Sequence, residues 1–142
     1  MNPESITVSL KTAKKLKKAG FNKKTVFVWD VYDNYFTCLD SESIDGLGHS
    51  YKRSKRLLFA GDVNRIHKKE WLDKFVEIYP APTSGEIDLP FPYTIVFVDN
   101  EFRISVDYDK NEFGPMGRVE CGKTEVKAKA KMWLYLKGKG LI

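Results

Sequence analysis

The chain has 142 residues, of which 42% are hydrophobic and 30% charged. A chain of this length buries about two-thirds of its unfolded surface, and nine Phe, seven Tyr and three Trp exclude a disordered protein. No apolar run reaches the length of a membrane span, and the N-terminus lacks the apolar core of a secretory signal. We therefore expect a single domain over residues 1–142, located in the cytoplasm and without membrane association.

The net charge of +5 is distributed in alternating blocks along the chain. Residues 1–24, 25–51, 52–70, 71–112 and 113–142 carry net charges of +6, −5, +5, −6 and +5. Such blocks either assemble one basic face in the fold or pair with one another and leave a mixed surface. The sequence leaves both outcomes open.

The first predicted element is a short amphipathic helix over residues 10–19. Ser9 suits the N-cap and Gly20 the C-terminal stop. At 100° per residue the apolar side chains share one half of the helix, and these are Leu10, Ala13, Leu16 and Ala19. The lysines share the other half, and these are Lys11, Lys14, Lys15 and Lys18.

Residues 25–32 are β-branched and aromatic, which predicts a strand, with a return arm over 35–39 after a turn at Asp33-Asn34. Residues 40–50 form a polar loop that lacks the full calcium-loop pattern. The densest basic cluster follows and consists of Lys52, Arg53, Lys55 and Arg56. It leads into a short strand over 55–59.

Residues 63–75 are predicted to be helical, and 76–81 an edge strand because Pro80 cannot donate to a ladder. Thr83 and Glu86 have the spacing of a capping box. Any helix there is short, since two prolines follow within six residues of Glu86.

The strongest pattern is a hairpin over residues 93–108. With Asp99 and Asn100 as a two-residue loop, aromatic and branched residues pair across the two arms: Phe97 with Phe102, Ile95 with Ile104 and Tyr93 with Val106. A three-residue loop would instead pair Val98 with Phe102, and both registers remain open.

Residues 109–122 are rich in turn formers and predict a connection. From Lys123 to Gly138 or Gly140 the pattern is helical and apolar around most of the girth. We expect this helix to pack on the apolar face of the hairpin, with Lys127 and Lys131 in solvent and the terminal Leu141-Ile142 returned to the core.

No catalytic, cofactor-binding or metal site is predicted. Cys38, His49, His67 and Cys121 could only form a zinc site if four scattered residues converged, and no spacing supports this. Neither cysteine has a flanking motif of a Cys–His nucleophile. We therefore predict that the protein is not an enzyme.

Several stretches together resemble a known group. They are Ser9 to Phe21, Pro80 to Thr83 with Glu86-Ile87, the aromatic hairpin, and Ala128 to Met132 with Leu134, Leu136 and Gly140 to Ile142. In this order they resemble small uncharacterised proteins encoded in phage and prophage regions of Bacteroides-type gut bacteria. The resemblance implies an α+β fold and a bacterial or phage-infected host cytoplasm, with no established activity.

The predicted fold is α+β, with one antiparallel sheet from residues 25–39, 55–59, 76–81 and 93–108, and with both terminal helices on one face. The absence of a site motif favours an accessory or protein-interaction protein of a phage or mobile element. The alternative is nucleic-acid binding through the basic blocks 11–24 and 52–56. That alternative requires eight cations to share one face, namely Lys11, Lys14, Lys15, Lys18, Lys52, Arg53, Lys55 and Arg56.

Overall fold

The computed structural model describes residues 2–37, 49–67, 76–111 and 114–142. The described strands form two three-stranded antiparallel sheets, with strand orders β2-β1-β3 and β4-β5-β6. The helices are α1 (Leu10–Lys18), α2 (Val63–Ile66) and α4 (Glu125–Gly138), with 3-10 turns at Pro3–Ser5, Ala60–Asp62 and Ser84–Glu86. The strands are β1 (Phe27–Thr37), β2 (His49–Phe59), β3 (Val76–Pro80), β4 (Tyr93–Val98), β5 (Glu101–Asn111) and β6 (Gly114–Gly122).

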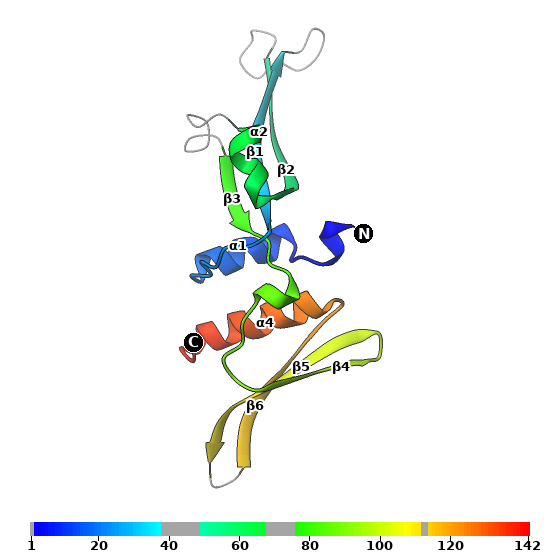
Figure 1. The fold of residues 1–142 in the computed structure, drawn as a ribbon, viewed down its shortest axis with the longest axis vertical. Helices are drawn as coiled ribbons and strands as arrows, with labels where there is room; N and C mark the ends of the chain where they lie inside the picture. The colour runs from blue at the N-terminus through cyan, green and yellow to red at the C-terminus, as the bar shows by residue number, and fades with distance from the viewer. Residues whose placement is uncertain (1, 38–48, 68–75, 112–113) are drawn as a thin grey trace.

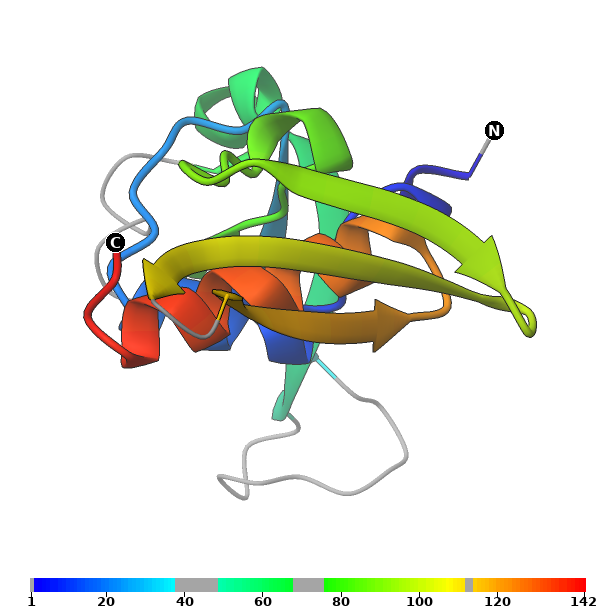
Figure 2. The ribbon, with the colours of Figure 1, turned by 90° about the horizontal axis from the view of Figure 1, so that it is seen from below.

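The two long helices lie between the two sheets. Figure 1 shows the first sheet, then α1, then α4 and then the second sheet, and Figure 2 shows α4 directly behind the second sheet. Helix α1 contacts β3, α4 contacts β5 and β6, and the helices contact each other. The α+β class is confirmed. The strands nevertheless divide into two sheets, each covered by its own helix, where the sequence predicts one sheet.

Helix α1 forms where the sequence predicts it. The Ser9 side chain accepts a hydrogen bond from the Thr12 backbone N–H, and Ala13 and Leu16 are completely buried. The helix stops at Gly20, whose φ of 96° is a backbone conformation that side chains disfavour. Phe21 folds back onto the core as expected.

The predicted turn at Asp33-Asn34 is wrong. Strand β1 runs straight through these residues to Thr37, and its partner is β2, which pairs Asp33 with Arg53 and Asn34 with Lys52. A long antiparallel partner satisfies the backbone of two residues that alone favour a turn, so pairing overrides local preference. The predicted loop over 40–50 falls largely outside the described residues.

The predicted connection over 109–122 is also wrong. Strand β5 continues to Asn111, and β6 returns along it as an edge strand. An edge strand tolerates Pro115, because one side of its backbone has no ladder partner. Gly117 suits this strand for a further reason, since a Cβ there would lie 2.7 Å from the Val106 carbonyl oxygen.

The hairpin and its two-residue register are confirmed. Strands β4 and β5 pair Tyr93 with Val106, Ile95 with Ile104 and Phe97 with Phe102. Asp99 and Asn100 both have positive φ, at 55° and 61°, as a tight hairpin loop requires.

Other predictions have mixed outcomes. Strand β3 is an edge strand, and the capping box of Thr83 and Glu86 is present. Helix α2 begins at Val63 as expected and ends at Ile66, and residues 68–75 lie outside the described chain.

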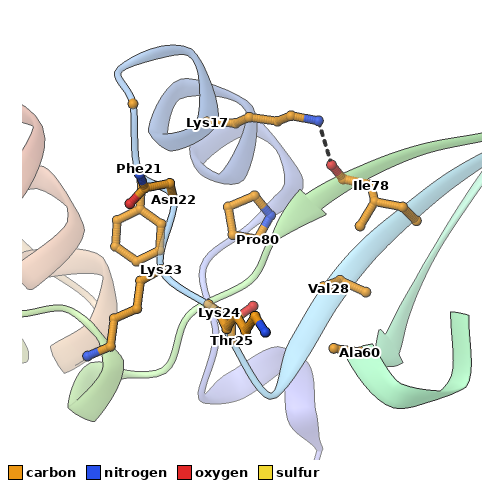
Figure 3. Close-up of a pocket in the computed structure, with 11 residues that line it drawn as sticks. Lys17, Phe21, Asn22, Lys23, Lys24, Thr25, Val28, Ala60, Ile78 and Pro80 are labelled. Carbon is orange, nitrogen blue, oxygen red and sulfur yellow. Dashed lines mark hydrogen bonds between the residues drawn. The ribbon is translucent and has the colours of Figure 1, made fainter.

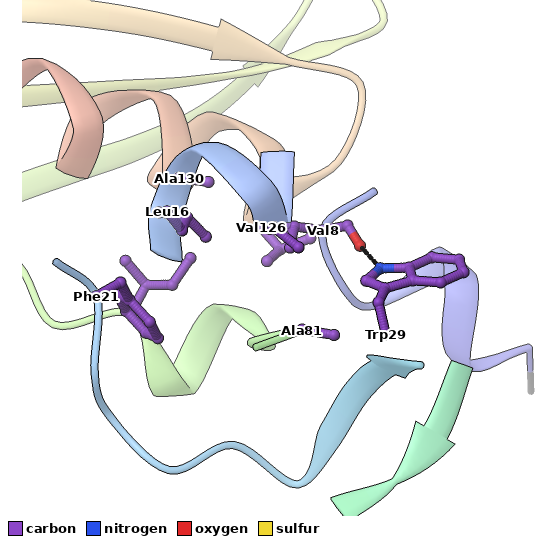
Figure 4. Close-up of a cluster of buried hydrophobic side chains, with 9 residues drawn as sticks. Val8, Leu16, Phe21, Trp29, Ala81, Val126 and Ala130 are labelled. Carbon is purple, nitrogen blue, oxygen red and sulfur yellow. Dashed lines mark hydrogen bonds between the residues drawn. The ribbon is translucent and has the colours of Figure 1, made fainter. Parts of the chain in front are cut away.

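Two clusters of buried side chains hold the layers together. The first joins α1, the first sheet and α4, and its buried members are Val8, Ala13, Leu16, Phe21, Trp29, Ala81, Ile87, Val126 and Ala130. Figure 4 shows this cluster, in which the Trp29 indole N–H donates a 2.9 Å hydrogen bond to the Val8 carbonyl. The second joins α4 to the second sheet through Ile104, Val106, Ala128, Met132 and Leu136.

Helix α4 contributes to both clusters. Its packing on the hairpin is as predicted, and Lys127 and Lys131 are exposed. Of the two terminal residues predicted to return to the core, Ile142 packs against the second cluster but Leu141 is exposed. The sequence did not predict the burial of Lys129. Its Nζ donates a 2.8 Å hydrogen bond to the Ser84 carbonyl, which satisfies one donor of the buried ammonium.

Candidate nucleic-acid interface

A basic surface covers α1 and the adjoining face of the first sheet. Strand β2 presents Arg53, Lys55 and Leu57 on one side because alternate residues share a face. Leu57 packs against the cluster that contains Leu16, so this is the side that α1 covers. We define the basic face as the exposed cations of these two elements: Lys11, Lys14, Lys15, Lys17, Lys18, Arg53 and Lys55.

Tyr79 connects the cations of the helix to those of the sheet. The ammonium nitrogens of Lys14 and Lys17 lie 5.7 and 4.9 Å from the centre of the Tyr79 ring. The Tyr79 hydroxyl donates to the Glu77 carboxylate, and Arg53 Nη2 lies 3.1 Å from Glu77 Oε2. The basic face is therefore continuous from α1 to β2, and among the side chains that the structure describes it includes the carboxylate of Glu77.

These contacts shift the pKa values of Glu77 and Tyr79. The hydrogen bond from Tyr79, followed by the positive charges of Arg53 and Lys14, holds the pKa of Glu77 below its usual value. The same hydrogen bond and carboxylate raise the pKa of Tyr79. Both shifts favour the ionised carboxylate and the neutral phenol.

Replacing Tyr79 with Phe should raise the pKa of Glu77 toward its ordinary value, because the largest stabilisation of the carboxylate is lost. Stability linked to a lowered carboxyl pKa is present above the unfolded-state value and lost as the pH falls through the folded-state value. The variant should therefore lose less stability on acidification than the wild type. Carbon-detected NMR titration of the Glu77 carboxyl measures the shift, and an unchanged pKa would contradict the role of Tyr79.

The structure brings together most of the cations that the nucleic-acid hypothesis names. Six of the eight belong to the basic face: Lys11, Lys14, Lys15, Lys18, Arg53 and Lys55. Arg56 does not, because it points to the opposite side of the first sheet. The Lys52 side chain lies outside the part that the structure describes. Lys17 belongs to the face although the sequence analysis did not name it.

Arg56 instead belongs to a buried polar cluster around Asp30. Asp30 is fully buried in the central strand, and its Oδ2 accepts from Arg56 Nε at 2.9 Å and contacts His67 Nε2 at 2.8 Å. The Arg56 guanidinium carbon lies 4.4 Å from the centre of the Tyr32 ring. Oδ1 of Asp30 is buried and has no hydrogen-bond partner among the residues that the structure describes.

This cluster stabilises the position of α2 against the first sheet. A carboxylate that holds an imidazole is also the arrangement that orients a histidine for proton transfer. However, no hydrogen bond joins His67 to a Ser, Thr or Cys within the described residues, so no nucleophile is positioned there. The sequence carried a signal for this cluster, since Asp30 interrupts an apolar strand and a buried carboxylate needs a partner. The predictions from the sequence do not include this cluster.

A second exposed surface lies on β4, at the edge of the second sheet. Tyr93, Val96, Phe97 and Val98 are between 42% and 60% exposed. The strand carries no charge and no proline, the features with which edge strands usually block unwanted pairing. We call these four residues the apolar edge.

Groups of three or more potential metal ligands do not occur among the described residues, and no described helix is long and apolar enough to span a membrane. No family model, curated protein or solved structure matches this chain.

Proposed function

We propose that this protein binds nucleic acid through the basic face. The observation that carries the proposal is the continuity of seven exposed cations over α1 and β2, joined at Tyr79. Lysine and arginine side chains on one face neutralise successive backbone phosphates and release their counterions. Tyr79 adds an aromatic ring beside the lysines, a combination that also occurs where proteins bind single strands.

Binding of this kind is independent of sequence. The cations of α1 are lysines, which act as point charges on phosphates, and the bidentate readout of bases is made mainly by Arg, Asn and Gln. Glu77 lies inside the face and repels phosphate, so we expect contacts on both sides of it. The proposal therefore predicts strong salt dependence and weak discrimination among sequences.

The test is fluorescence anisotropy with labelled duplex DNA, single-stranded DNA and RNA at about 50 and 200 mM salt, where phosphate-driven affinity changes steeply. The double variant Lys14→Glu with Lys18→Glu should weaken binding at least about tenfold for any sequence, because two phosphate contacts become repulsive. The three probes also show which type of strand fits the face.

A matched control carries the same change of charge elsewhere. Lys127→Glu with Lys131→Glu alters the exposed edge of α4 and leaves the basic face intact. This control should bind within about twofold of the wild type at equal salt. Equal weakening by both double variants would show that only net charge matters, and no binding at the lower salt would refute the proposal.

The apolar edge supports a second candidate function. We propose that β4 accepts an extended segment of a protein partner, as expected for an accessory protein of a phage or mobile element. Alternate residues of an edge strand direct their N–H and C=O groups away from the sheet, where a further strand can pair with them. Exposed side chains of β4 would contact alternate residues of that segment.

A displayed library of short extended peptides tests this candidate. Selection on the wild type should yield alternating apolar sequences that fail to bind Val96→Lys, because a charge on an edge strand blocks pairing. Val119→Lys places the same charge on exposed β6 and should leave peptide binding intact. The candidate fails if no selected peptide distinguishes these two variants.

A further inference from the structure

A pocket of about 650 Å³ opens beside the C-terminal end of α1. It lies between the segment that leads from α1 to β1, the end of β3, and the turn after β2 (Figure 3). Its wall includes Lys17, Lys23, Lys24, Val28, Ile78 and Pro80. The volume is within the range of small-molecule sites, about 300–1,000 Å³.

The wall of the pocket combines an apolar surface with positive charge. Val28, Ile78 and Pro80 provide aliphatic surface, and none of the lining residues is Asp or Glu. Three lysines line the pocket, so a bound anion would meet only favourable charges at its wall. Surfaces of this composition suit a ligand with an apolar body and one anionic group.

The three lysines differ in what they can offer a ligand. Lys23 forms a 2.8 Å ion pair with Asp88, and Figure 3 shows its side chain extending away from Pro80. Lys17 donates a 2.8 Å hydrogen bond to the Ile78 carbonyl, which leaves two of its three N–H donors. Lys24 is exposed and has no hydrogen bond or ion pair among the described contacts.

We propose that this pocket binds a small anionic amphiphile, with its anionic group at Lys24 and its apolar body against Val28, Ile78 and Pro80. Lys17 lines the pocket and also belongs to the basic face, but Lys24 and the aliphatic wall do not, so substitution of Lys24 tests the pocket separately from the nucleic-acid proposal. A long-chain carboxylate is the simplest molecule of this chemistry.

Isothermal titration with decanoate, kept below its micelle-forming concentration, tests the proposal. Decanoate should bind at one site, and decan-1-ol, which has the same apolar body without charge, should bind at least about tenfold more weakly. Lys24→Glu should weaken decanoate binding at least about tenfold and leave decanol binding unchanged. Ala60→Trp, at an exposed lining position, should obstruct the pocket and reduce the binding of both molecules.

Lys127→Glu is the matched control, since it makes the same change of charge on the exposed side of α4. It should leave decanoate affinity within about twofold of the wild type. The proposal is overturned if decanoate does not bind, if decanol binds equally well, or if Lys127→Glu weakens decanoate as much as Lys24→Glu does. Circular dichroism of each variant confirms that the fold is retained.

Discussion

Replacing Arg56 with Met lowers the free energy of unfolding by about 3 kcal/mol, the lower end of the cost of removing one partner from a buried ion pair, because Asp30 is fully buried but Arg56 is partly exposed. Met retains the length of the aliphatic stem, so the loss comes mainly from the charge. Asp30 is fully buried, and without Arg56 its carboxylate keeps, within the described part of the chain, the contact with His67 alone. Chemical denaturation at neutral pH, with the slope against denaturant compared between variants, measures the change.

A second substitution separates loss of charge compensation from loss of packing. Asp30→Asn in the Arg56→Met background removes the uncompensated carboxylate and should restore a large part of the lost stability. Asp30→Asn alone should cost less than Arg56→Met, because the Arg56 side chain is 36% exposed and can reach water. If the double variant is no more stable than Arg56→Met, the ion pair is not the source of the loss.

Replacing Gly122 with Ala destabilises the fold by about 1–3 kcal/mol, the typical cost of forcing extra volume into a packed site. A Cβ at this position would lie 2.7 Å from the Ala128 backbone nitrogen and 2.9 Å from Lys127 Cβ. The obstacle includes the backbone of α4, which cannot move without loosening the second cluster. Thermal unfolding followed by circular dichroism measures the loss.

Gly138→Ala is the control for that substitution. A Cβ at Gly138, in the last turn of α4, would have no described atom within 4 Å apart from its chain neighbours and the backbone of its own helix. Alanine is the better helix former, so this variant should be equal to the wild type or more stable by up to about 1 kcal/mol. Equal destabilisation by the two substitutions would contradict the close approach at Gly122.

Local patterns predicted the elements that depend on near neighbours in the chain. The hairpin loop at Asp99-Asn100 needs two residues that tolerate positive φ, and α1 needs a cap at Ser9 and an apolar stripe. The residues that determine the loop and the helix lie close together in the chain, so both elements can be predicted from the sequence alone.

The errors concern elements whose partners are distant in the chain. Asp33-Asn34 favours a turn locally, yet β2 holds it extended from about twenty residues away. The division into two sheets depends on which strands pair, and the periodicity of apolar residues within a strand does not identify its partner. Arg56 is assigned to the wrong face for the same reason, because the extent of β2 depends on its pairing with β1. Once β2 is known to extend through residues 53–56, strict alternation separates Arg53 and Lys55 from Arg56.

The composition of the first cluster bears on how the protein is made in the cell. Val8 and Leu16 leave the ribosome long before Val126 and Ala130 of the same cluster, which follow far later in the chain. The apolar side of α1 therefore has no complete partner until α4 has been synthesised. Nascent chains with exposed apolar surface are prone to aggregation and are protected by chaperones. Release of the C-terminal helix is the step that ends this exposure.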